Sequence, residues 1–182
     1  IDIADRERRL LSFINLVEVH VLSAIRREHT VPLYKIRRAI DYLGKQFESE
    51  HPLATHRFET DGIDLFVSEV GSLINVSREG QLAIRKMISA HLRRVEWNHG
   101  IAARLYPFTR KEAKDEPRVV VIDPRIAFGR PVLVGTGIPT GIIAERLKAG
   151  ETMDELAKDY DRDRSEIEEA VRCELRLNTE AA

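Results

Sequence analysis

Residues 119–175 read VVVIDPRIAFGRPVLVGTGIPTGIIAERLKAGETMDELAKDYDRDRSEIEEAVRCEL. Two runs rich in β-branched residues open this stretch, at 119–122 and 131–134, and the turn-rich segment DPRIAFGR joins them. Short β-branched runs bounded by Pro and Gly are typical of strands. The pattern therefore predicts a short pair of strands.

Three short helices are predicted after these strands. Pro139 suits the start of the first helix, and Gly150 suits its C-terminal end. The next two helices begin with residues at capping-box spacing, Thr152 with Glu155 and Asp163 with Glu166. Their apolar residues recur three and four positions apart and are expected to face inward: Met153, Leu156, Ala157, Tyr160, Ile167, Ala170, Val171 and Leu175. A small β unit followed by three helices predicts a helix-turn-helix-like domain over residues 118–182.

The upstream part of the chain is also predicted to be mainly helical. Apolar spacing predicts helices at 12–28, 32–47 and 79–98. Ser12 is the expected N-cap of the first helix, and Pro32 opens the second. The segment HPLATHRFETDGIDLFV, residues 51–67, carries strand-forming residues around Asp61-Gly62. A two-stranded ribbon with a tight turn is therefore predicted there.

The charged run TRKEAKDEP, residues 109–117, lacks periodic apolar residues and is predicted to be a linker. It would separate a domain at 1–108 from a domain at 118–182. The expected fold class is mainly α with small β elements (α+β), arranged as two winged-helix or helix-turn-helix-like domains.

Composition excludes several classes of protein. The 182 residues are 43% hydrophobic and 32% charged, which allows a buried core and excludes a wholly disordered chain. The single cysteine, Cys173, excludes an internal disulfide and a cysteine-rich zinc site. No apolar run is long enough to span a membrane, and the first residues are charged, so we expect a cytoplasmic protein. Ile at position 1 suggests a processed or truncated chain.

The net charge of −1 hides an uneven distribution. Residues 1–116 carry 19 Lys and Arg against 17 Asp and Glu, whereas residues 117–182 carry 10 against 13. A uniformly basic coat for nucleic acid is therefore excluded, and any contact with nucleic acid must be local.

The motif GRPVLVGTGIP at 129–139, followed by the three predicted helices, resembles the bacterial family called domain of unknown function 433. Upstream, LLSFINLVEVHVLSAIRREHTVPLYKIRRAIDYL followed by HPLATHRFETDGIDLFV is similar to the MerR-like winged-helix region that precedes this module in VapB-type antitoxins. The resemblance implies a protein that neutralises a PIN-like ribonuclease toxin and represses its own operon by binding DNA. Gly137 stands where many members have a basic residue, so a phosphate contact at this position is not implied. The resemblance further implies that the chain begins at the wing of the MerR-like region or just past it, so a DNA-reading helix is expected upstream.

Basic residues near the first two predicted helices are the candidate DNA contacts. They could position the protein on phosphates without reading base sequence. They are Arg6, Arg8, Arg9, Lys35, Arg37 and Arg38. The alternative, both for the cluster at 6–9 and for the basic residues of the second predicted helix, is a solvated charged surface.

Candidate toxin contacts are assigned by elimination to the acidic second half. The last predicted helix carries carboxylates that would repel phosphates, so it is expected to face protein rather than a DNA groove. An aromatic anchor would add local burial energy. The residues are Phe128, Glu166, Glu168 and Glu169.

No motif in the sequence indicates catalysis, a metal site or a cofactor. GRPVLVGTG lacks the Gly-Lys-Ser/Thr of a phosphate-binding loop, and the six histidines lack zinc-ligand spacing. The leading hypothesis is an antitoxin that dimerises and acts by occlusion, with a ribonuclease and operator DNA as partners. The main alternative is a stand-alone DNA-binding transcription regulator with a sensor or interaction domain. A small enzyme is the third reading.

Overall fold

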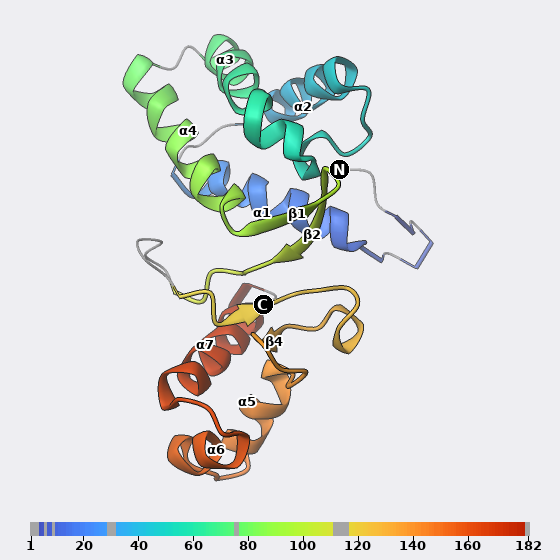
Figure 1. Ribbon diagram of the computed structural model, residues 1–182. Coiled ribbons are helices and arrows are strands. Elements are labelled where there is room, and N and C mark those ends of the chain that lie inside the picture. Colours follow the sequence, from blue (N-terminus) through green and yellow to red (C-terminus); the bar gives the residue numbers. More distant parts are fainter. Residues whose placement is uncertain are drawn as a thin grey trace. The chain divides into compact units, whose positions relative to one another are not determined.

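The computed structural model describes residues 4–5, 7–8, 10–28, 32–74, 77–110 and 117–180. The chain forms two compact units, Ile1–Ala103 and Arg104–Ala182. Helices dominate both units, and small two-stranded sheets accompany them (Figure 1). The prediction of a mainly α fold with small β elements is therefore confirmed.

The first unit is built around amphipathic helices. They are α1 (Phe13–Glu28), α2 (Leu33–Phe47), α3 (Ile63–Ile74) and α4 (Arg78–Leu92). The two helices predicted at 12–28 and 32–47 are confirmed as α1 and α2. Ser12 caps α1 as expected, because its Oγ accepts a 3.1 Å hydrogen bond from the backbone N–H of Asn15.

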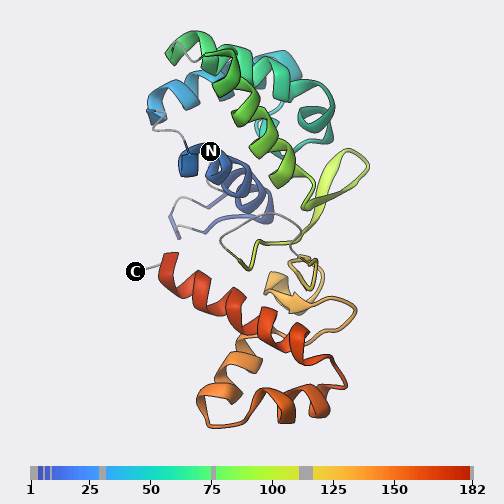
Figure 2. The same cartoon turned by 90° about the vertical axis from the view of Figure 1, so that its left-hand side faces the viewer.

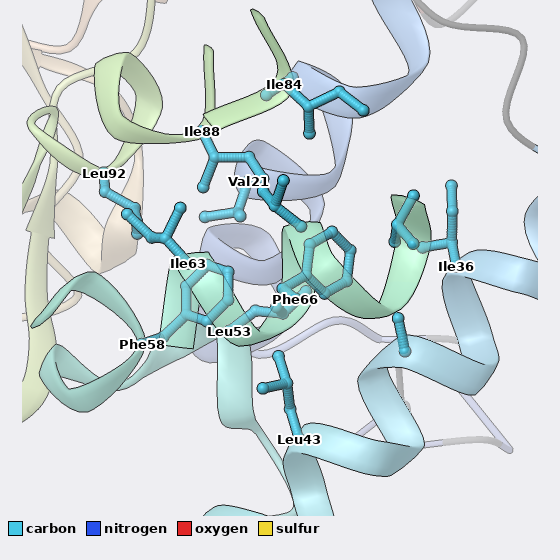
Figure 3. Close-up of a cluster of buried hydrophobic side chains, with 14 residues drawn as sticks. Val21, Ile36, Leu43, Leu53, Phe58, Ile63, Phe66, Ile84, Ile88 and Leu92 are labelled. Carbon is cyan, nitrogen blue, oxygen red and sulfur yellow. The ribbon is translucent and has the colours of Figure 1, made fainter. Parts of the chain in front are cut away.

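The core of the first unit lies between these helices. Figure 3 shows Phe66 pointing toward Val21 and Ile88, with Phe58 close by. The rings of Phe58 and Phe66 meet edge to face, with centroids 6.0 Å apart. Aromatic pairs favour this geometry, so the two rings anchor the core.

The ribbon predicted at 51–67 is wrong. This segment contains a 3₁₀ turn, Pro52–Ala54, and a π-helical turn, Phe58–Gly62, that runs directly into α3. Gly62 does not form a hairpin turn; a Cβ there would lie 2.7 Å from the Phe58 ring. Glycine is needed for this close packing, and helical burial of the apolar residues outweighs their strand preference.

The helix predicted at 79–98 ends early. Helix α4 stops at Leu92, and strand β1 (Val95–Asn98) pairs with strand β2 (Ile101–Leu105). His99 and Gly100 join the strands with positive φ values of 48° and 80°. Two successive positive φ values are typical of a tight hairpin turn whose twist matches the strands. The hairpin of this region thus lies some 40 residues after the predicted one.

The second unit follows the predicted order of elements. Strands β3 (Val120–Val121) and β4 (Val132–Leu133) are antiparallel, with Val120 opposite Leu133. Helices α5 (Thr140–Lys148), α6 (Met153–Tyr160) and α7 (Arg164–Glu180) follow, and α7 packs along α5 and α6 (Figure 2). Their shared core is formed by Leu133, Ile143, Leu156, Ile167, Ala170 and Val171.

The helix ends of the second unit largely match the predicted caps. Thr152 and Glu155 form both hydrogen bonds of a capping box. The Glu166 carboxylate accepts a 3.2 Å bond from the backbone N–H of Asp163. Leu175 was expected to face inward but is 58% exposed, so that assignment is wrong.

Residues 104–110 belong to the second unit, although residues 104–108 were assigned to the first domain and residues 109–110 to the linker. Leu105 exchanges backbone hydrogen bonds of 3.0 and 2.8 Å with Ile122, which extends the edge of β3. Thr109, the first residue of the predicted linker, is buried in this unit. Residues 111–116, the middle of that linker, lie outside the described residues.

Candidate interaction surfaces

Helix α2 presents an exposed basic side. Its apolar side buries Ile36, Ala39 and Leu43 in the core of the first unit, which leaves Arg37 and Arg38 exposed to solvent. Tyr34 lies one turn earlier and is also exposed. Exposed cations on a helix that is firmly anchored by its other face suit contact with a phosphate backbone.

The other basic residues assigned to DNA are placed differently. Lys35 is half-buried, and its ammonium donates a 2.6 Å hydrogen bond to the backbone carbonyl of Leu73. Its charge therefore helps to hold α2 near the end of α3. Arg8 is exposed and lies beside Asp5, with Nε 3.9 Å from the carboxylate oxygen. Arg6 and Arg9 lie outside the described residues.

Asp123 is the centre of a charged cluster in the second unit. Its carboxylate is 1% exposed and accepts hydrogen bonds from Arg104 Nε at 2.9 Å and from Arg125 Nη2 at 2.7 Å. The backbone N–H of Arg125 donates to the same carboxylate at 2.9 Å. The side-chain bond from Arg125, aided by the one from Arg104, holds the pKa of Asp123 well below its usual range.

Residues 123–130, here called the Phe128 loop, form a turn with unusual backbone angles. Ala127, Phe128 and Gly129 have positive φ values of 47°, 58° and 76°. Only glycine adopts such angles without a steric cost. The Phe128 side chain is 99% exposed, although phenylalanine is among the residues most often buried. The loop therefore displays an apolar ring in a strained conformation.

Glu169 is not a surface carboxylate. It is 1% exposed and accepts bonds from Arg110 Nη2 and Arg172 Nη1, both at 2.5 Å, and from the Thr109 hydroxyl. Burial alone would raise the pKa of Glu169, but these bonds outweigh it and lower the pKa. Glu169 thus fastens residues 109–110 to α7.

Glu166 and Glu168 are partly exposed, but both face cations of their own unit. Glu168 lies 3.1 Å from Arg164 Nε and 3.7 Å from Arg172 Nη2. Glu166 lies 4.0 Å from Arg162 Nη1. The predicted acidic surface is therefore a network of ion pairs rather than a row of free carboxylates.

Sequence reasoning missed the Asp123 cluster and the role of Glu169. Asp123 is followed by Pro124 and Arg125, a spacing that lets an aspartate accept from the backbone two residues later. That signal was present in the sequence. Arg172 is three residues away on the same helix, but Thr109 and Arg110, the other two partners of Glu169, are about 60 residues away along the chain, and no local pattern indicates them.

The described part of the chain also bears on metal binding and membrane insertion. Within it, no group of three or more His, Cys, Asp or Glu side chains is arranged to hold a metal ion. None of the helices described in it is both long and apolar enough to cross a lipid bilayer.

Comparison with known proteins gives a family match for the second unit. Residues 120–172 match the family described as "Protein of unknown function (DUF433)". The matched region runs from β3 into α7 and includes the Phe128 loop and Glu169.

One curated relative and one solved structure match across both units. "Putative antitoxin VapB45" of Mycobacterium tuberculosis is 29% identical over 163 residues, which cover 82% of this chain and 65% of that protein. The chain thus spans less than two thirds of the length of this relative. The crystal structure of Rv2018 from the same organism has a TM-score of 0.67 and 24% identity, and covers 88% of this chain and 78% of its own. The similarity to this crystal structure shows a shared fold.

Proposed function

We propose that the chain is the antitoxin of a type II toxin–antitoxin system. It would bind a PIN-like ribonuclease toxin and mask it, and it would repress its own operon by binding operator DNA. The observation that carries this proposal is the similarity to a protein named as an antitoxin, because that similarity runs through both units. The mechanism is occlusion by complementary surfaces, with no bond made or broken.

The DNA contact in this proposal rests on α2. Arg37 and Arg38 are exposed on a helix whose opposite face is buried, so their charges stay in a fixed place. Arg8 adds a cation near the start of the chain. Lys35 supports the position of α2 through its hydrogen bond to the Leu73 carbonyl. Arg6 and Arg9 remain predictions. With about four to six phosphates neutralised, the logarithm of the affinity should fall with the logarithm of salt concentration at a slope of roughly −4 to −5.

Reversing the charge of both arginines, Arg37→Glu with Arg38→Glu, is expected to weaken operator binding at least about 30-fold at 0.15 M salt and to make the salt slope shallower by about 2. The reason is the loss of two phosphate contacts. Fluorescence anisotropy with operator duplex over a range of salt concentrations measures both quantities.

A matched control reverses two exposed lysines of the second unit, Lys148→Glu with Lys158→Glu. This control makes the same change in net charge and should leave the slope unchanged. Equal losses in the two double variants would mean that α2 makes no specific contact and that only total charge matters.

The toxin contact in this proposal lies in the second unit, at Phe128 and on the side of α7 that carries Glu166 and Glu168. Glu169 is buried and is not expected to touch a partner; its bonds to Thr109, Arg110 and Arg172 stabilise this part of α7. A homodimer would match the two-fold symmetry of an operator. Sedimentation that shows a monomer at high protein concentration would contradict the dimer.

Co-purification tests the proposed function. The full chain is expressed with the product of the neighbouring reading frame, and the complex is isolated by a tag on one partner. A stable complex with a ribonuclease is expected. Binding to DNA without any nuclease partner would instead favour a stand-alone transcription regulator.

A further inference from the structure

Within the Phe128 loop, Phe128 itself has a strained backbone, and its exposed ring makes no compensating burial in its own unit. We infer that this loop is a preformed docking element, whose Phe128 ring enters an apolar pocket with an acidic rim on the nuclease partner. The inference rests on the proposed function and names the surface that performs it.

Phe128 is costly to the free unit. A bulky residue with positive φ is strained, and Phe128 has φ 58° and ψ 33°. Its ring also gains nothing from burial, because it is 99% exposed. Glycine at this position would avoid both costs. A residue that is unfavourable on both counts in the free unit is best explained by a gain that appears on binding.

Backbone hydrogen bonds and apolar packing hold the loop in place. The backbone N–H of Ile126 donates to the Asp123 carbonyl at 2.9 Å, and that of Gly129 donates to the Ile126 carbonyl at 2.9 Å. Ile126 and Ala127 pack against the buried side chains of Tyr106, Val121 and Val132. A ring presented on a fixed turn loses little conformational entropy on binding, which is the property of an efficient anchor.

The charges around the ring favour a partner surface with acidic groups. Arg125 and Arg104 beside Asp123 are 65% and 42% exposed, so that cluster has a net charge of +1. Arg130, next to Gly129, is exposed as well. Aromatic and Arg side chains are the residues that most often dominate protein interfaces. The arginines would face acidic groups at the edge of the pocket that receives the ring.

A protein is favoured over nucleic acid as the occupant. Stacking of a base on Phe128 with phosphates on the arginines is the rival arrangement. However, residues 104–182 carry 14 Lys and Arg against 16 Asp and Glu, so the unit that bears the loop has a net negative charge. Such a unit repels a long polyanion but not a protein whose acidic groups are local.

The test measures binding of the full chain to the purified nuclease from the neighbouring reading frame by calorimetry. Phe128→Ala and Phe128→Gly are both expected to weaken binding about 30-fold or more. Arg130→Glu is also expected to weaken binding, and its effect should be larger at low salt than at high salt. Phe128→Gly should fold at least as stably as the original chain, because glycine relieves the positive φ. Ile142→Ala, at another exposed apolar residue of the second unit, is the control and should bind normally.

The outcomes separate the inference from the proposed function. A loss of at least tenfold in both Phe128 variants, with the fold retained and the control unchanged, supports the docking loop. A loss below tenfold, while the original chain binds, overturns the loop and leaves the antitoxin proposal intact. Failure of the original chain to bind overturns both. Binding of a 20-residue single-stranded oligothymidine or self-association that depends on Phe128, with nuclease binding unchanged, assigns the ring to another occupant and overturns the inference.

Discussion

Replacing Glu169 by alanine is expected to lower the free energy of unfolding of the second unit by about 2–4 kcal/mol. The carboxylate is buried and accepts bonds from Thr109, Arg110 and Arg172. Hydrogen bonds to a charged group are stronger than neutral ones, and here they also hold residues 109–110 against α7. Hydrogen exchange of the α7 amides reports the stability of this unit directly.

Glu168→Ala is the matched control for this change. The two glutamates are neighbours on α7, but Glu168 is 35% exposed and pairs with cations that are themselves in solvent. Exposed ion pairs contribute about 0–1 kcal/mol, so this variant should remain nearly as stable as the original chain. Equal protection of the α7 amides in both variants would show that Glu169 does not fasten the segment.

Acidification from pH 6 to pH 3 is expected to destabilise the second unit through Asp123 and Glu169 together, by at most about 3 kcal/mol, the limit in which neither folded carboxyl binds a proton. In the folded unit the pKa of each carboxyl is lowered, Asp123 mainly by Arg125 and Glu169 by bonds that outweigh its burial. Stability from a carboxyl with a lowered pKa is complete above the pKa of the unfolded chain, near 4, and is lost as the pH falls toward the folded pKa. The unfolded chain then binds protons that the folded unit does not.

Asp123→Asn separates the contribution of Asp123 from that of other carboxyls. The variant should be less stable at pH 7, because a neutral amide accepts more weakly from Arg104 and Arg125. Its stability should also fall by about 1 kcal/mol less than that of the original chain between pH 6 and pH 3. Hydrogen exchange of the second unit at several pH values provides the comparison. Parallel pH profiles for the two proteins would contradict the lowered pKa of Asp123.

The second unit was largely predictable from sequence because its signals are local. β-Branched runs, a capping box at Thr152 and Glu155, and a glycine at the end of α5 each act within a few residues. The structure contains the corresponding strands and helices in the predicted order. Local signals of this kind need no knowledge of distant contacts.

The errors in the first unit arose where tertiary packing decides. Asp61-Gly62 has the composition of a hairpin turn, yet Phe58 and Phe66 are buried together in the helical core. The true hairpin turn, His99-Gly100, lies after an apolar pattern that continues the spacing of α4. Local propensity cannot decide between these two turn positions, because the core that stabilises one of them is formed by residues far apart in sequence.

The candidate sites were predictable only as residue types. The sequence showed three glutamates close together on one helix, but it could not show that Glu169 is buried while Glu166 and Glu168 are not. Phe128 was assigned by elimination as an exposed aromatic anchor; the structure confirms that its ring is exposed and adds its strained backbone. Burial and backbone angles therefore distinguish which of these similar residues can contact a partner and which have a structural role.

Inhibition of the nuclease by this chain is the most direct test of the account. Purified ribonuclease from the neighbouring reading frame is titrated with the full chain while cleavage of an RNA substrate is followed. Cleavage is expected to fall in proportion to the amount of chain added and to stop at a fixed molar ratio, while the chain alone is expected to turn over no substrate. Undiminished cleavage in the presence of a large excess of the chain would contradict it.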